Sequence, residues 1–148
     1  MARNYQSLRA VKRPEGALWL DTSISRNNMK SVIALVTRRA GQYRVFGAAW
    51  GGPAAITGVE VRIDGGLWRP AAIDRRNSDF GWLLWSIAWN DAAPGHDTLV
   101  SRARNALGEV QPTREELLDQ RVSNREDNSQ WARTVILYRS PRSRFAMP

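Results

Sequence analysis

The segment 59–64 constrains the fold more than any other, because hydrophobic and charged residues alternate there without a break. Val59, Val61 and Ile63 fall on one face of an extended chain, and the three charged residues between and after them fall on the other. A period of two is typical of an antiparallel strand with one buried face. Asp64-Gly65-Gly66 comes next, and such residues tolerate the positive φ of a tight hairpin. We therefore expect a turn and a returning strand over Leu67–Ile73.

Further short extended segments surround this hairpin, separated by turns rich in glycine, proline and asparagine. With it they make about seven strands at roughly ten-residue spacing and no alternating helices, which predicts an all-β fold, an antiparallel β-sandwich over residues 30–138. The further strands are expected at Lys30–Thr37, Gln42–Trp50, Phe80–Trp89, Asp97–Arg104 and Trp131–Tyr138.

The two ends of the chain differ from this middle part. Residues 1–29 form a separate arm or linker, in which Asn4–Val11 and Ala17–Thr22 are expected to pair around Pro14-Glu15-Gly16. A lone two-stranded hairpin is marginally stable in water, so the arm needs a surface to pack on. Residues 113–130 are polar, with a short helix expected at Arg114–Arg121, and residues 139–148 form a basic tail.

Charge and hydropathy narrow the classes of function. The 148 residues carry a net charge of +8, and the excess lies at the two ends while the middle is nearly balanced. Nucleic-acid binding through the basic termini is therefore a weak hypothesis, because such domains gather basic charge on one face. No apolar run is long enough to span a bilayer and no secretory signal is visible, so no membrane partner is expected and the compartment stays unknown.

The residues that usually carry catalysis are scarce. Cysteine is absent and His96 is the single histidine, which excludes disulfides, thiolate metal sites and chemistry that needs two histidines. His96-Asp97 is interpreted as a turn at a strand entry, and Glu115-Glu116 as a solvated helix surface. We expect no catalytic, cofactor-binding or metal-binding residue, and no activity from this chain by itself.

Tryptophan is the informative residue type. Four of the seven tryptophans lie between Trp68 and Trp89. In the expected strand, Trp82 shares a face with Leu84, and Trp85 and Trp89 share the opposite face. Three interpretations stay open: a plain core, a face that contacts a neighbouring polypeptide, where Trp and Arg are enriched, or a platform for sugars or bases. The candidate interface residues are Trp50, Trp82, Trp85, Trp89 and Arg102.

Five segments, in order, resemble the C-terminal domain of the sulfite oxidase family of molybdenum enzymes. Gly47-Ala48-Ala49-Trp50 is similar to its G-x-A-W strand, and residues 59–68 are similar to its VEV-S-x-D-G-G-x-W hairpin. Trp82, Trp85 and Trp89 stand where that family has its W-x-x-W strand. Gly95-His96-Asp97 resembles its P-G-x-H element, and residues 101–112 resemble its R-A-x-D-x-x-G-x-x-Q-P signature, with Asn105 in place of Asp.

The resemblance implies an immunoglobulin-like sandwich over residues 30–138 that serves for homodimerisation and for packing on a molybdopterin-binding catalytic domain. It also implies that residues 1–29 correspond to the end of that catalytic domain and its linker. In complete family members a cysteine of the catalytic domain binds the molybdenum, so the molybdopterin–molybdenum cofactor is expected in a partner and not in this chain. The alternative function is a free-standing immunoglobulin-like module that binds a carbohydrate or a protein.

Overall fold

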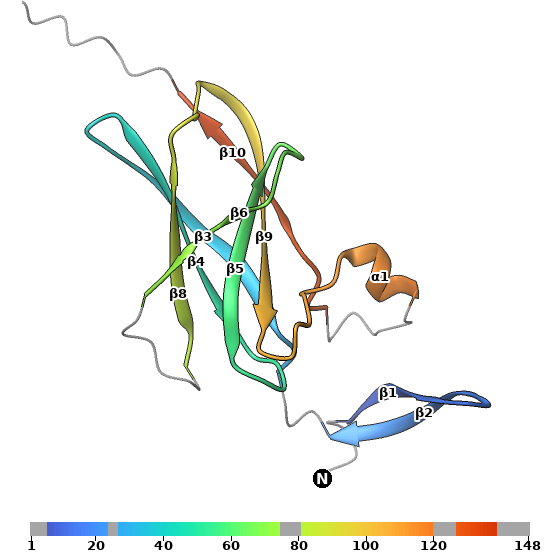
Figure 1. Ribbon diagram of the computed structural model, residues 1–148. Helices are drawn as coiled ribbons and strands as arrows, with labels where there is room; N and C mark the ends of the chain where they lie inside the picture. The colour runs from blue at the N-terminus through green and yellow to red at the C-terminus, as the bar shows by residue number, and fades with distance from the viewer. Residues whose placement is uncertain (1–5, 24–26, 75–80, 120–126, 139–148) are drawn as a thin grey trace, which may run out of the picture.

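The chain begins with a hairpin. The structure is a computed structural model that describes residues 6–23, 27–74, 81–119 and 127–138. Strand β1 (Gln6–Arg13) pairs antiparallel with β2 (Gly16–Ser23), with Arg13 opposite Gly16. This agrees with the hairpin that the sequence predicts around Pro14-Glu15-Gly16. Figure 1 shows the hairpin beside one end of the main body of the protein.

Two antiparallel four-stranded sheets form that main body (Figure 1), which confirms the predicted all-β sandwich. The order in one sheet is β3-β4-β8-β7, and the order in the other is β10-β9-β5-β6. The first sheet contains β3 (Lys30–Arg39), β4 (Gln42–Trp50), β8 (Leu83–Trp89) and β7 (Ala72–Ile73). The second contains β10 (Ala132–Leu137), β9 (Gly95–Asn105), β5 (Ile56–Ile63) and β6 (Arg69–Pro70).

The core lies between the sheets and follows the alternation of the strands. Val59 and Val61, predicted to be buried, are 2% and 1% exposed and face the other sheet, while Glu60 between them points outward. From β4 and β8 the core receives hydrophobic side chains of very different size. The best buried hydrophobic residues are Val45, Ala49, Val59, Val61, Trp85, Trp89, Leu99 and Ala103.

The expected single strand over Leu67–Ile73 is wrong in one respect. It is two short strands, one in each sheet: β6 pairs with β5, and β7 pairs with β8. Pro70 has no N–H to continue the first ladder, and Ala71 N donates to Val59 O at 2.8 Å before the chain crosses to the other sheet. Within the described residues the sandwich therefore has eight strands, where about seven were expected.

A buried amide and a short helix complete the fold after β9. Helix α1 (Arg114–Asp119) begins where the sequence predicts. Thr113 caps it: Glu116 N donates to Thr113 Oγ1 at 3.2 Å and Thr113 N donates to Glu116 Oε2 at 2.7 Å, a reciprocal capping box. Just before it, Gln111 is 1% exposed. The end of the expected helix at Arg121 and the tail from residue 139 lie outside the described residues.

Candidate interface surface

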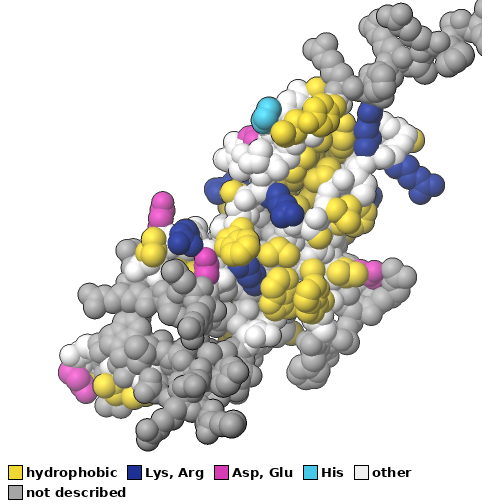
Figure 2. Space-filling model, turned by 180° about the vertical axis from the view of Figure 1, so that it is seen from behind, with side chains coloured by type: hydrophobic (Ala, Val, Ile, Leu, Met, Phe, Trp, Pro, Cys, Tyr) yellow, Lys and Arg dark blue, Asp and Glu magenta, His cyan; other side chains and the backbone are white. Residues whose placement is uncertain are grey.

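The outer face of the β3-β4-β8 sheet is apolar toward the Trp50 end of β4 and polar toward the start of β4, where Arg44 Nη1 donates to Ser86 Oγ at 3.1 Å. In the ladders, Val32 lies opposite Ala48 and Leu35 opposite Phe46 on β3 and β4, and Ala48 lies opposite Leu84 on β8. Leu35 and Leu84 are 49% and 51% exposed. Figure 2 looks onto this side of the molecule, where hydrophobic side chains gather over the sheet. We define the apolar face as Val32, Leu35, Phe46, Ala48, Trp50, Trp82 and Leu84.

A bulge in β3 produces this face. Between Ile33 and Leu35 the register of β3 shifts against β4. Without the shift, residues 32 and 35 would point to opposite sides of the sheet; with it, Val32 and Leu35 both point outward and Ile33 and Val36 point to the core. Sequence reasoning missed Leu35, because alternation counted along one strand does not reveal an extra residue. It also missed Phe46, although Phe46 alternates with the buried Val45 and Gly47.

Two indoles stack at one end of the apolar face. The Trp50 and Trp82 rings are 5.1 Å apart with an interplanar angle of 19°. Trp82 is 67% exposed, so the stack presents a large, rigid hydrophobic surface to solvent. These are two of the predicted interface residues, brought together from β4 and the residue preceding β8.

A second exposed indole lies near the start of β3 and was not singled out from the sequence. Trp131 is 57% exposed, and Lys30 Nζ lies 3.7 Å from the centre of its ring. The same ammonium donates to the main-chain oxygen of Asp127 at 2.9 Å. Burial lowers the pKa of Lys30, opposed by the Asp127 carboxylate. The ammonium is thus fixed between a ring and a carbonyl.

The remaining predicted interface residues lie elsewhere. Trp85 and Trp89 are both 2% exposed and belong to the core of this chain. Tyr43 packs on Trp89, with ring centres 6.1 Å apart. Their side chains therefore offer no surface to a partner. Arg102 lies on the opposite sheet, where its Nε donates to Glu60 Oε2 at 2.8 Å, so it is separated from the apolar face by the whole core.

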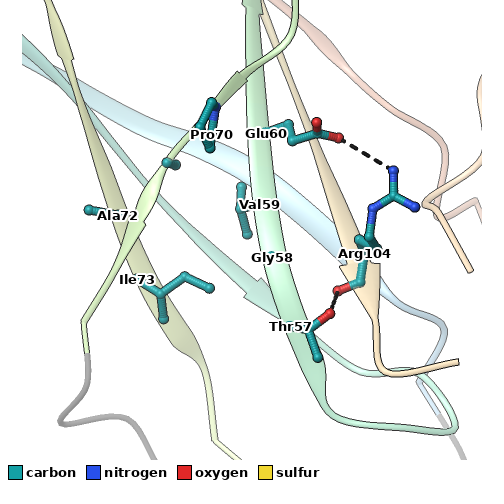
Figure 3. A pocket seen from close by; sticks show the side chains of 9 residues that line it. Thr57, Gly58, Val59, Glu60, Pro70, Ala72, Ile73 and Arg104 are labelled. Atoms are coloured by element: carbon teal, nitrogen blue, oxygen red, sulfur yellow. Dashed lines mark hydrogen bonds and ion pairs between the residues drawn. The ribbon is translucent and has the colours of Figure 1, made fainter. Parts of the chain in front are cut away.

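A shallow cavity of about 610 Å³ opens beside β5, where the chain crosses from β6 to β7 (Figure 3). The polar side chains that line it are paired with one another. Thr57 Oγ1 donates to Arg104 O at 3.4 Å, and an Arg104 nitrogen lies 3.9 Å from Glu60 Oε2. Its other lining is mostly small and aliphatic, from Pro70 to Ile73. The cavity presents no catalytic arrangement.

The donor set of the chain does not fit a molybdenum centre. The chain has no cysteine to supply a thiolate. In the described ranges, no three His, Asp or Glu side chains come together as metal ligands. No helix in the same ranges reaches the length and hydropathy needed to span a membrane.

Asp97, at the start of β9, gives a pH-dependent prediction. Its Oδ2 is buried and has no hydrogen-bond partner in the described part of the chain. Burial raises the pKa of Asp97, the nearby carboxyl groups of Asp64 and Asp91 raise it further, and His96 opposes them. The folded state thus holds the proton more tightly than the unfolded state, so this group costs stability as the pH rises from the acidic range to neutrality. Asp97→Asn should therefore raise the free energy of unfolding by about 1 kcal/mol at pH 7.

Urea unfolding at several pH values tests this expectation. The gain should disappear when the pH falls below the ordinary pKa of an aspartate, about 4. Asp91→Asn is the control of opposite sign, because the Arg69 guanidinium, at 2.6 and 2.8 Å, lowers the pKa of Asp91 to about 2. That variant should lose stability at pH 7. A gain from Asp97→Asn that is the same at every pH would contradict the assignment.

Comparison with known proteins gives one kind of match. A scan against protein-family models finds no match, and neither does a search of the curated proteins. Among solved structures, the chain is similar to a chain in the crystal structure of the sulfane dehydrogenase SoxCD from Paracoccus pantotrophus, with a TM-score of 0.66 and 26% sequence identity. The match covers 89% of this chain and 34% of that chain. The protein therefore spans about a third of the length of its structural neighbour.

Proposed function

We propose that this chain is the dimerisation and scaffold domain of a molybdenum oxidoreductase of the sulfite oxidase type, and that its own residues do not catalyse the reaction. The observation that carries the proposal is the apolar face, where Leu35, Trp82 and Leu84 are about half exposed or more. A sheet face of this kind is unfavourable in water and is typical of a surface that another polypeptide covers.

Two independent likenesses support the proposal. The chain corresponds to about a third of a sulfane dehydrogenase chain, at 26% identity. The segments that resemble the sulfite oxidase family are also the ones that build the sandwich. Gly47 to Trp50 lie on β4, residues 59–68 comprise most of β5 and the turn after it, and Gly95-His96-Asp97 begins β9. The resemblance therefore concerns the framework of the fold and not a scattered set of residues.

The molybdopterin–molybdenum cofactor belongs, in this proposal, to a partner catalytic domain. This chain lacks the cysteine that binds the metal in complete family members. What the chain contributes is a surface: its apolar face packs on the same face of a second copy, on the catalytic domain, or on both. A contact between two copies through this face is isologous, so each exposed indole contributes to the interface from both copies. The β1–β2 hairpin, with Leu18 and Leu20 at 39% and 43% exposed, provides a second apolar surface for the catalytic domain.

Replacing two residues of the apolar face tests the proposal. We expect the wild-type chain to sediment as a dimer, and the Trp82→Glu/Leu84→Glu variant to sediment as a monomer with a dissociation constant at least about tenfold higher. A charge buried at the centre of an interface without a partner costs more than the roughly 1.4 kcal/mol that a tenfold change requires. Leu107→Glu is the matched control, because Leu107 is 67% exposed like Trp82 but lies in the turn after β9. It should leave the dimer intact.

Other results would overturn this assignment. A wild-type chain that stays monomeric and soluble at high concentration argues against a self-complementary face. If, in addition, the tryptophan fluorescence of that monomer shifts on titration with a neutral oligosaccharide, the stacked Trp50–Trp82 pair is better explained as the platform of a free-standing binding module.

A further inference from the structure

The outer face of the other sheet has a different chemistry, based on arginine. From β5 and β9 it presents Arg62, Arg102 and Arg104, together with Glu60 and with Trp68 from the turn after β5. We call these five residues the arginine face. Glu60 lies directly opposite Arg102 in the ladder and pairs with its Nε at 2.8 Å; an Arg104 nitrogen lies 3.9 Å from the same oxygen. One carboxylate thus serves two guanidinium groups.

The indole of Trp68 orders this arrangement. The guanidinium carbon of Arg102 lies 4.0 Å from the centre of a Trp68 ring, and that of Arg62 lies 4.7 Å from it. Stacking engages the flat side of a guanidinium and leaves its N–H edge free, and it fixes a side chain that otherwise loses much rotamer freedom on binding. Arg62 and Arg102 are therefore held in place before any ligand arrives.

The positive charge of this face is not balanced within the described residues. Arg62 forms no ion pair there, and its Nε is buried without an acceptor. Asp64, which follows the end of β5, accepts a hydrogen bond from Thr98 N at 2.7 Å. Arg102 uses its Nε for Glu60, which leaves its terminal amino groups for another acceptor. Two guanidiniums, those of Arg102 and Arg104, thus share the carboxylate of Glu60, and the guanidinium of Arg62 has no carboxylate partner among the described residues.

We infer that the arginine face is a binding site for an acidic segment of a partner protein, in extended conformation. The spacing supports a segment and not a free inorganic anion. Arg102 and Arg104 are two residues apart on β9, so their Cα atoms are about 7 Å apart along the strand. Carboxylates on alternate residues of an extended peptide have the same spacing. Planar guanidiniums bind carboxylates in bidentate fashion. This inference goes beyond the proposed function, because it uses the sheet opposite the apolar face.

Peptide binding at low ionic strength tests this inference. The probe is a short fluorescein-labelled peptide of alternating Glu and Thr, followed by anisotropy. We expect the Arg62→Gln/Arg104→Gln variant to bind it about tenfold more weakly than the wild type. Arg38→Gln/Arg39→Gln is the control, since it removes the same charge from exposed positions at the far end of β3. It should change the affinity by less than about twofold, and thermal melts verify that both variants fold.

Several results would overturn the inference. The first is no binding of the peptide by the wild type. The second is an equal loss of affinity in both double variants, which would indicate that net charge alone attracts the peptide. The third is displacement of the peptide by sodium sulfate as readily as by unlabelled peptide, which would indicate an inorganic-anion site. The Trp82→Glu/Leu84→Glu variant should bind the peptide like the wild type. Failure of dimerisation and failure of peptide binding are therefore separate outcomes.

Discussion

Gly47→Ala is expected to lower the free energy of unfolding by about 3 kcal/mol, at the upper end of what overpacking a core costs. Gly47 lies in the middle of β4, opposite Ile33 on one side and Trp85 on the other. A methyl group there would overlap the Trp85 ring and the main-chain oxygen of Val32. The ring is fixed by the core and the oxygen belongs to a neighbouring strand, so neither can move without disturbing the sheet.

A second glycine in a strand provides the control. Gly58 lies in β5, and a Cβ built on it meets nothing within 4 Å. Gly58→Ala should therefore be neutral or slightly stabilising. For a domain of this size, 3 kcal/mol corresponds to a decrease in Tm of roughly 10 °C, which thermal unfolding followed by circular dichroism resolves. If the two alanine variants melt at the same temperature, the close approach of Trp85 to β4 is refuted.

The same contact explains in physical terms one sequence segment that resembles the sulfite oxidase family. In Gly47-Ala48-Ala49-Trp50, the first residue leaves room for the Trp85 ring and the third, 0% exposed, closes the core beside it. Trp50 points to the other side of the sheet and stacks on Trp82. Gly47 and Ala49 are thus required on the core side of β4, and Trp50 is required on its outer side. This short segment therefore takes part both in core packing and in the apolar face.

Most of the framework could be predicted from the sequence, because its signals are local. The alternation at Val59, Val61 and Ile63 places β5 correctly, and the bounds predicted for β4, Gln42–Trp50, agree with the structure. The prediction that Trp82 lies on one face of its strand and that Trp85 and Trp89 lie on the opposite face is also correct: Trp85 and Trp89 face the core, and Trp82 faces solvent. Each of these inferences needs only the period of a strand and the hydrophobicity of its residues.

The candidate site was harder to predict, because its geometry depends on pairings between distant segments. Nothing local to Leu35 indicates that a bulge turns it outward, and nothing local to Trp68 indicates that two arginines from different strands stack on it. Arg102 was selected as an interface residue on composition alone, and it lies on the sheet opposite Trp50 and Trp82. Alternation tells which side of a strand a residue occupies, and sheet topology decides which neighbours it has there.

Gln111 is the clearest case of such a long-range pairing. In the sequence it belongs to the segment 101–112 that resembles the family signature, but no local pattern there predicts what its side chain does in the fold. In the fold its side-chain oxygen accepts from Ser31 N at 2.8 Å and from Ala103 N at 3.2 Å. Its amide nitrogen donates to the main-chain oxygens of Asn128 and Ser129, both at 3.0 Å. One buried amide therefore joins β3, β9 and the segment that leads into β10.

Gln111→Ala is expected to cost about 4 kcal/mol, comparable to the whole stability of a marginal domain. Four main-chain groups, three of them buried, would lose their partner, each at about 1 kcal/mol or more, and a cavity would remain. Gln111→Glu separates these two causes because it keeps the volume. Its carboxylate cannot donate to Asn128 and Ser129, so at pH 7 it should also destabilise the protein strongly, and part of the loss should be recovered on acidification.

Urea unfolding followed by tryptophan fluorescence measures both variants. Gln42→Ala, at an exposed position at the start of β4, should remain within about 0.5 kcal/mol of the wild type. If Gln111→Glu were as stable as the wild type at neutral pH, the two hydrogen bonds that the Gln111 amide donates to Asn128 and Ser129 would contribute nothing to stability. The expected result is the opposite: hydrophobic burial brings the sheets together, and the Gln111 amide fixes how β3 and β9 meet, which sets the relative orientation of the apolar face and the arginine face.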